Sequence, residues 1–151
     1  MNLKIDGTEH IAVPAAAVWR FVSDPGSVGR CLPDLQELQV VDPQHLIAFV
    51  KIGVGPVRGR FKMEMALAPG DGELGLRLKG SGLGSGLQMK AQLRLAGAAA
   101  GTDLHWTAEA SVSGPLASVG GRLLDAQAKK TVQQLFANIR HSLESTGAVA
   151  T

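Results

Sequence analysis

A change in the spacing of apolar residues constrains this 151-residue chain more than any other feature. From residue 35 to residue 113, apolar and polar side chains alternate, which is the period of strands with one buried face. After Gly114 and Pro115, apolar residues recur at helical spacing as far as Leu143. The pattern predicts about six antiparallel strands, then one helix of about 29 residues, which would be roughly 44 Å long.

The N-terminal region adds one strand and two short helices. Residues 2–13 alternate, but Glu9 interrupts the apolar side, so we expect either a bulge or an exposed strand end there. Pro14 favours the start of a short helix over residues 15–21, because proline suits a first helical turn. A second short helix is predicted at residues 26–31.

The two patterns together predict the fold class. A sheet with one apolar face needs a cover, and the C-terminal helix is the one predicted element large enough to supply it. A sheet of this size twists and curls. We therefore expect an α+β fold in which a curved antiparallel sheet of about seven strands wraps around the long helix. Residues 1–145 would form a single domain, followed by a frayed tail at residues 146–151.

Composition excludes several classes of function. A single cysteine rules out an internal disulfide and a multi-cysteine metal site. An aromatic content of 4% argues against a base-stacking platform, and scattered charges with a net value of +2 indicate no nucleic-acid partner. Neither a signal-peptide core nor a membrane-length apolar stretch occurs, so we expect a cytoplasmic protein in which Cys31 stays reduced.

The predicted site is a cavity between the sheet and the long helix. The inward positions carry no ionisable group, and small side chains such as Ala48 and Ala91 face a space that they need not fill. The predicted ligand-binding residues are Val50, Ile52, Phe61, Met63, Met65, Leu76, Leu78, Met89, Leu93, Trp106, Ala108, Leu124, Ala128 and Val132. Among them, the three methionines allow two interpretations: they fill an irregular core, or they form an adaptable lining for a large apolar ligand.

Catalytic and metal-binding interpretations are weaker. A catalytic group could come from Glu9, Ser81, Ser85 or Ser113, which lie at or near predicted strand ends. The histidines are far apart in the sequence and lack metal-ligand spacing, which favours solvated surface side chains; they are His10, His45, His105 and His141.

Glycine-rich and basic segments complete the candidate features. Residues 80–86 lack the lysine of a phosphate loop, and we expect a mobile loop that gates the cavity. At Gly120 and Gly121 we expect the backbone to pack closely against a strand; close approach to a ligand, or a helix that begins only after the two glycines, are the alternatives. Arg58, Arg60 and Lys62 would form a solvated face, or alternatively meet an acidic partner or anionic lipid, and both interpretations stay open.

The element order resembles the helix-grip fold of the START, polyketide cyclase and birch-pollen-allergen superfamily. Within it, four stretches are similar to the G-subunit family of carbon monoxide dehydrogenase. They are Ala12-Val13-Pro14 through Trp19 with Asp24-Pro25 and Cys31-Leu32-Pro33; residues 54–61; the glycine run at 80–86 with the strand that ends in Leu93 and Leu95; and residues 113–117 with 120–124.

The resemblance implies a non-enzymatic accessory protein of a molybdenum-containing dehydrogenase. Such a protein would bind a quinone or lipid in its cavity, which favours the methionines as lining, and it would help recruit the dehydrogenase to the membrane. The implied partner is a molybdenum-flavin-iron–sulfur dehydrogenase, with peripheral contact at the inner face of the cell membrane and no covalently bound cofactor. A polyketide cyclase-like or hydrolase-like enzyme is the alternative, and a docking protein with a filled core is the third hypothesis.

Two departures from the family pattern bear on these expectations. Some members carry a long C-terminal extension that can anchor them to membrane, whereas this sequence stops about where the predicted helix does. Asp34 follows Leu32 and Pro33, where the family usually has glycine, and this change affects a loop near the expected cavity mouth.

Overall fold

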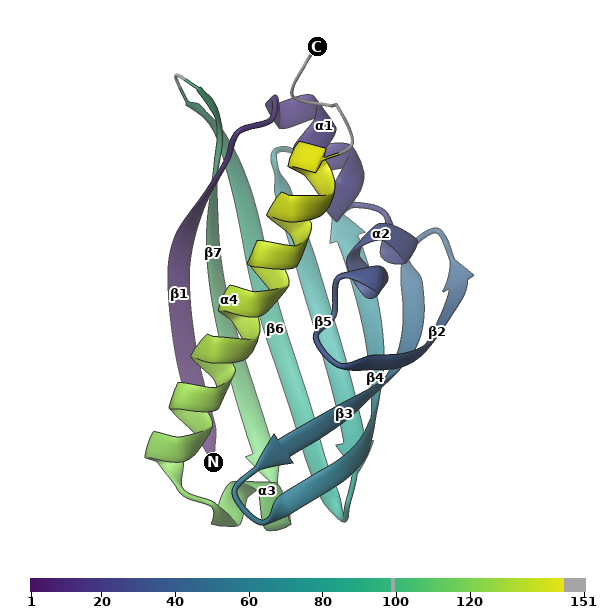
Figure 1. Ribbon diagram of the computed structural model, residues 1–151, viewed down its shortest axis with the longest axis vertical. Helices are drawn as coiled ribbons and strands as arrows, with labels where there is room; N and C mark the ends of the chain where they lie inside the picture. Colours follow the sequence, from purple (N-terminus) through teal and green to yellow (C-terminus); the bar gives the residue numbers. More distant parts are fainter. Residues whose placement is uncertain (99, 146–151) are drawn as a thin grey trace.

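In the computed structural model, a seven-stranded antiparallel sheet curves around one long helix (Figure 1). The structure describes residues 1–98 and 100–145, so the tail predicted at residues 146–151 lies outside the described residues. The strands are β1 (Asn2–Ile11), β2 (Leu35–Asp42), β3 (His45–Val54), β4 (Val57–Pro69), β5 (Glu73–Gly82), β6 (Ser85–Ala98) and β7 (Gly101–Ser113). The helices are α1 (Ala15–Val22), α2 (Pro25–Arg30), α3 (Pro115–Ser118) and α4 (Gly121–Ser145).

The sheet order is β1-β7-β6-β5-β4-β3-β2, which confirms the predicted helix-grip arrangement. Consecutive strands from β2 to β7 are neighbours, and β1 returns to pair with β7. The chain therefore starts at one edge of the sheet and places β2 at the other edge. Between these edges, each strand turns its apolar side toward the helices and its charged side outward.

The helices cover the inner face of the sheet (Figure 1). Buried side chains of α4, namely Phe136, Ile139 and Leu143, share one core with inner-face residues such as Leu46 and Leu104. α1 packs near β6 and β7, whereas α2 packs near β2 and β3. The apolar face is thus covered by three helices rather than by α4 alone.

The chain after β7 forms two helices where the sequence predicted one. α3 ends at Ser118, and Gly120 then adopts a φ of 99°, which only glycine adopts without strain. The close packing predicted at Gly120 and Gly121 is wrong, because no atom outside the local backbone lies within 4 Å of a Cβ placed at either residue. The positive φ of Gly120 instead lets the chain turn between α3 and α4.

Residues 80–86 form a tight hairpin, so the predicted mobile loop is wrong. β5 continues to Gly82 and β6 begins at Ser85, which leaves a two-residue turn at Leu83 and Gly84. Both turn residues have positive φ values, 56° and 74°, as the favoured two-residue hairpin turns require. The sequence pattern did not predict the end of β5, because its inner positions are glycines, Gly80 and Gly82, and the alternation of apolar and polar side chains therefore stops before the strand does.

Glu9 also differs from the expectation of a bulge or an exposed end. β1 pairs with β7 without a register shift, and Glu9 lies opposite Leu104 on the inner side. Its carboxylate accepts a hydrogen bond from Arg140 Nη2 of α4 at 2.8 Å, and Arg140 Nε donates to the carbonyl of His10 at 3.1 Å. The charge on the apolar side of β1 therefore joins the strand to the helix.

Asp34 occupies a conformation that explains the usual glycine of the family. Its φ is 56°, in the left-handed region, where glycine has no steric cost and aspartate has a small one. The Asp34 carbonyl accepts a hydrogen bond from the Lys51 amide at 3.0 Å. The loop before β2 is therefore held to β3 in spite of the substitution.

Replacing Thr102 with valine tests how the start of β7 is held. The fully buried Thr102 hydroxyl donates to the Val13 carbonyl at 2.7 Å, and valine keeps the shape but removes the donor. We expect Thr102→Val to lower the free energy of unfolding by about 1–3 kcal/mol, because the buried carbonyl loses this donor. Thr107→Val, at an exposed position of the same strand, is the matched control. Equal urea midpoints for the two variants would contradict the expectation.

Candidate ligand-binding site

The predicted ligand-binding residues gather in the region between the sheet and α4, which we call the sheet–helix site. The buried apolar residues form two clusters, one large and one small. Thirteen of the fourteen predicted residues belong to these clusters or pack against them, and the fourteenth, Ala128, is half-buried on α4. Leu124 belongs to the smaller cluster, with Val54, Val112 and Leu116. That cluster closes the end of the molecule near α3, so Leu124 lies at the margin of the site.

The predicted lining residues divide equally between buried and half-buried positions. The buried members are Val50, Phe61, Met65, Leu78, Trp106, Ala108 and Leu124. The half-buried members are Ile52, Met63, Leu76, Met89, Leu93, Ala128 and Val132. Since β5 and β6 are central strands, half-buried inner side chains on them indicate that α4 does not cover this part of the sheet completely.

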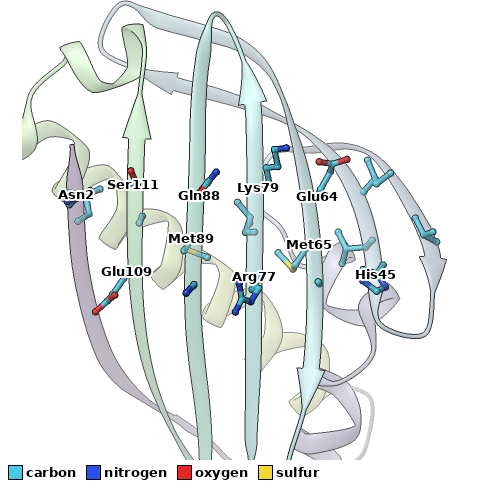
Figure 2. A pocket seen from close by; sticks show the side chains of 18 of the residues that line it. Asn2, His45, Glu64, Met65, Arg77, Lys79, Gln88, Met89, Glu109 and Ser111 are labelled. Atoms are coloured by element: carbon cyan, nitrogen blue, oxygen red, sulfur yellow. The ribbon is translucent and has the colours of Figure 1, made fainter.

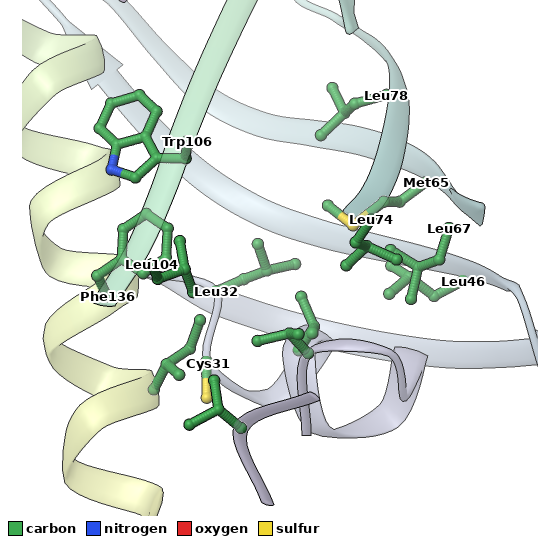
Figure 3. Packing of buried hydrophobic residues seen from close by; sticks show 14 of the residues in the cluster. Cys31, Leu32, Leu46, Met65, Leu67, Leu74, Leu78, Leu104, Trp106 and Phe136 are labelled. Atoms are coloured by element: carbon green, nitrogen blue, oxygen red, sulfur yellow. The ribbon is translucent and has the colours of Figure 1, made fainter. Parts of the chain in front are cut away.

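Trp106 is the largest side chain among the predicted lining residues and lies beside α4 (Figure 3). Its indole stacks on Phe136 of α4, with the ring centroids 5.9 Å apart and an interplanar angle of 26°. The ring also lies on Gly7 of β1, where a Cβ would stand 2.8 Å from Trp106 Cζ2. Trp106 can occupy this place because the strand beside it carries glycine at the paired position.

Phe61 is seated in the same way on β5. A Cβ at Gly80 would collide with Phe61 Cε1, and a Cβ at Gly82 would lie 3.0 Å from Phe61 Cδ2. The glycine run thus makes room for an aromatic ring in the core. Sequence reasoning missed this role, although glycine at an inward position of an alternating strand was a usable signal.

The polar residues considered for catalysis do not gather in the site. Ser81 and Ser113 are exposed, and the Ser85 hydroxyl accepts a hydrogen bond from the Leu116 amide at 2.9 Å. Glu9 is bound to Arg140. Each of these groups therefore has a structural partner or lies away from the interior.

Cys31 is buried near the C-terminal end of α4. Burial raises the pKa of its thiol, and its Sγ lies 3.9 Å from Ser142 Oγ. A raised pKa keeps the thiol protonated at neutral pH, which makes it a poor nucleophile. Asn138 Nδ2 donates to the Cys31 carbonyl at 2.9 Å, so this residue ties the end of α2 to α4.

The histidines lie apart from one another. His10 pairs with Asp103 at 2.9 Å, His45 pairs with Asp42 at 2.7 Å, and His105 Nδ1 lies 3.0 Å from Thr8 Oγ1. Within residues 1–98 and 100–145, no three His, Cys, Asp or Glu side chains are grouped so as to hold a metal ion.

A hollow of about 1110 Å³ lies on the outer face of the sheet (Figure 2). In this view α4 lies behind the sheet, and the labelled side chains include Glu64, Arg77, Lys79 and Glu109. Charged side chains of both signs line this hollow beside apolar ones such as Ile47. Sequence alternation could not predict it, because it depends on how the whole sheet curves.

The three basic residues of β4, Arg58, Arg60 and Lys62, each have a hydrogen-bond or ion-pair partner. Arg60 Nη2 donates to Glu37 at 2.7 Å and its guanidinium lies 4.2 Å from the Phe49 ring centroid. Lys62 Nζ lies 3.8 Å from a Glu64 oxygen, whereas the hydrogen bond of Arg58 Nε goes to a backbone carbonyl, that of Gly55. Two of the three cations thus have carboxylate neighbours, which favours the solvated-face interpretation for them.

Comparison with known proteins identifies the family. The sequence profile of the CoxG family, the G-subunit of carbon monoxide dehydrogenase, matches residues 7–144. The chain belongs to this family. A search of curated protein sequences found no match to this CoxG-family chain.

Solved structures show the same fold at low sequence identity. A conserved protein from Geobacillus kaustophilus superposes with a TM-score of 0.86 and 21% identity, over 95% of this chain and 97% of that one. A START superfamily protein from Mycobacterium smegmatis gives 0.74 and 16%, over 95% and 98%. The Zhui aromatase/cyclase from Streptomyces sp. R1128 gives 0.69 and 15%, over 95% and 94%.

Among the described residues, no helix is both long and apolar enough to cross a bilayer.

Replacing Gly7 with alanine tests how Trp106 is seated. The added Cβ would lie within 3.0 Å of three indole atoms, so we expect Gly7→Ala to displace the ring and lower the free energy of unfolding by about 1–3 kcal/mol. Gly97→Ala on β6 is the control, because a Cβ there meets nothing within 4 Å. Near-ultraviolet circular dichroism should change for Gly7→Ala alone, and identical spectra and midpoints for both would contradict this packing.

Proposed function

We propose that this chain is a non-enzymatic accessory protein that binds a large apolar molecule, a quinone or a lipid, in the sheet–helix site. The observation that carries the proposal is the row of half-buried apolar side chains on the central strands, Leu76, Met89 and Leu93. These side chains lie on the inner face of the sheet and are only partly covered. Burying them against a ligand would gain roughly 25 cal/mol for each Å² of apolar surface.

The enzyme alternative has the fold likeness to an aromatase/cyclase in its favour. A cyclase or hydrolase needs an acid, base or nucleophile within reach of its substrate. In the described part of the chain, the charged pair nearest the interior is Glu9–Arg140, and its groups are bound to each other and to the backbone of His10. The lining therefore supports binding better than catalysis.

Family membership supports the rest of the proposal. The partner would be a molybdenum-flavin-iron–sulfur dehydrogenase, to which the ligand or its electrons pass. The protein would act in the cytoplasm, at the inner face of the cell membrane, and would hold no covalently bound cofactor.

One end of the molecule suits contact with an anionic membrane. The β3–β4 turn meets the start of α4, where a Cβ at Gly55 would lie 3.3 Å from Leu123 Cδ2. Leu83 in the β5–β6 turn lies against Gly59, and Leu83 and Leu123 are 40% and 42% exposed. Segments 53–60, 80–88 and 114–124, which form this end, contain no acidic residue.

Two exposed arginines accompany the leucines at this end. Arg58 lies in the first segment, and Arg122 directly precedes Leu123. Exposed leucines can insert among lipid chains while arginines bind phosphate head groups, a combination that favours anionic bilayers. Leu83 also holds a φ of 56°, which is costly for leucine and marks a position where asparagine or glycine is preferred.

Filling the sheet–helix site should block ligand binding. Ala91 is half-buried on the inner side of β6, and Ala96 is exposed on the same strand. We expect Ala91→Leu to weaken binding of an added quinone by about tenfold and Ala96→Leu to leave it unchanged, because only the former occupies ligand space. Equilibrium dialysis measures the affinity, and thermal unfolding checks that both variants fold.

The wild-type protein gives the direct test of the proposal. Organic extraction of the purified protein followed by mass spectrometry should recover a quinone or lipid. Repeated failure to recover either, together with no binding on addition, would overturn the proposed function.

Replacing Leu83 with asparagine should weaken membrane contact without harming the fold. Asparagine suits the left-handed conformation, and it removes the apolar side chain that would insert into lipid. We expect about tenfold weaker sedimentation with phosphatidylglycerol vesicles, while Val41→Asn, which is at a 58% exposed position on β2, has no effect. An equal loss for both variants would contradict the assignment of this end.

A further inference from the structure

A group of basic side chains lies in the outer-face hollow, on the central strand β5 and its neighbour β6. They are Arg77, Lys79 and Lys90, which we call the cation cluster, and all three are exposed. Within residues 1–98 and 100–145, none of these side chains forms an ion pair or a hydrogen bond. The middle of the hollow therefore carries positive charge that the protein itself does not neutralise.

The register of the sheet places two of these cations in an unfavourable pair. Arg77 lies directly opposite Lys90 on β6, and its partner on the other side is Ala66 on β4. Like charges directly opposite one another on antiparallel strands are destabilising. Because the Cβ atoms of such a pair are only about 5 Å apart, an anion between the two side chains would contact both. An anionic occupant of the hollow would thus relieve a repulsion that the sheet leaves in place.

Two carboxylates stand beside the cation cluster, one on each side (Figure 2). Glu64 on β4 and Glu109 on β7 are cross-strand neighbours of the cluster, and each has another cation near it. Lys62 Nζ lies 3.8 Å from Glu64 Oε1, and Lys4 Nζ lies 3.2 Å from Glu109 Oε1. A narrow occupant along β5 and β6 would meet the cations, whereas a broad anionic surface would meet both carboxylates as well.

The spacing of the cations along β5 matches that of an extended chain. Arg77 and Lys79 are alternate residues of the strand, so their side chains leave the same face about 7 Å apart. Carboxylates at alternate positions of an extended segment have the same separation. Such a segment, lying along β5, would bring one carboxylate between Arg77 and Lys90 and the next beside Lys79.

We propose that the outer-face hollow binds an extended acidic segment of a partner protein, with its carboxylates on the cation cluster. Nucleic acid and anionic bilayers fit less well, because each presents negative charge over a width that includes Glu64 and Glu109. The proposal does not rest on the proposed function, since α4 and the sheet–helix site lie on the opposite face of the sheet (Figure 2). A segment in the hollow and a ligand in the sheet–helix site would not compete.

A labelled synthetic peptide of glutamates, each separated by one serine, is the probe. Fluorescence anisotropy at low salt measures its affinity, because exposed ion pairs are least screened there. We expect Arg77→Gln together with Lys90→Gln to weaken binding by about five- to tenfold. Arg94→Gln together with Lys51→Gln removes the same charge from exposed positions outside the hollow and should change the affinity by less than about twofold.

Nuclear magnetic resonance of the isotope-labelled wild-type protein gives the location of the bound peptide. The amide signals of residues 77–79 and 88–90 should shift on titration, and those of α4 should not. The same peptide with glutamine in place of glutamate should cause no shift.

Unfolding of the free protein separates a binding role of Arg77 from a structural one. Since its cross-strand partners are Lys90 and Ala66, removing its charge relieves repulsion and breaks no ion pair. We expect Arg77→Gln to leave the urea midpoint unchanged or to raise it. A lowered midpoint would show that the charge supports the fold and would overturn the proposal.

The remaining outcomes each decide the proposal. It falls if the peptide does not bind the wild-type protein, if both double variants lose equal affinity, or if the shifted amides lie away from the hollow. Displacement of the peptide by free glutamate at equal carboxylate concentration would assign the hollow to a small anion instead. An equal loss of binding to single-stranded DNA or to phosphatidylglycerol vesicles in the first double variant would also overturn it. None of these outcomes affects the recovery of a ligand by extraction, which tests the proposed function.

Discussion

Water must be kept from the inner face of the sheet, because every strand turns apolar side chains toward it while the outer face carries the charges. α4 supplies the largest part of the cover through Phe136, Ile139 and Leu143, and α1 and α2 supply the rest. This arrangement also leaves inner side chains on β5 and β6 half-buried. The same constraint that holds the fold together thus creates the place where a ligand can complete the cover.

Aromatic rings fill the core only where the facing strand leaves room for them. Trp106 lies on Gly7 and Phe61 lies on Gly80, and in both cases a methyl group on the glycine would meet the ring. Close packing of this kind holds each ring in one orientation. For Trp106 that orientation leaves Nε1 without an acceptor, so tight packing and an unsatisfied polar group occur in the same residue.

Much of the fold could be predicted because strand and helix periods are local properties. Alternation over residues 35–113 predicted about six antiparallel strands, which are β2 to β7, and Pro14 correctly predicted the start of α1. Prediction failed at residues 80–86 and at Glu9, where the deciding partners are Phe61 and Arg140. The distance from Glu9 to Arg140 in the sequence is far beyond any local period. Alternation and helical spacing could assign residues to the inner face of the sheet and to α4, but the division of these residues into buried and half-buried ones depends on the tertiary structure.

The sequence by itself determined that the sheet has one apolar face, that a long helix follows it, and that the segments of one end carry no acidic residue. These properties depend on residue order alone. Only the tertiary structure decided which glycines receive aromatic rings, that the Trp106 nitrogen lacks a partner within the described residues, and that the outer face holds a charged hollow. Each of these depends on distances between strands and helices that are remote in the chain, and the curvature of the whole sheet sets those distances.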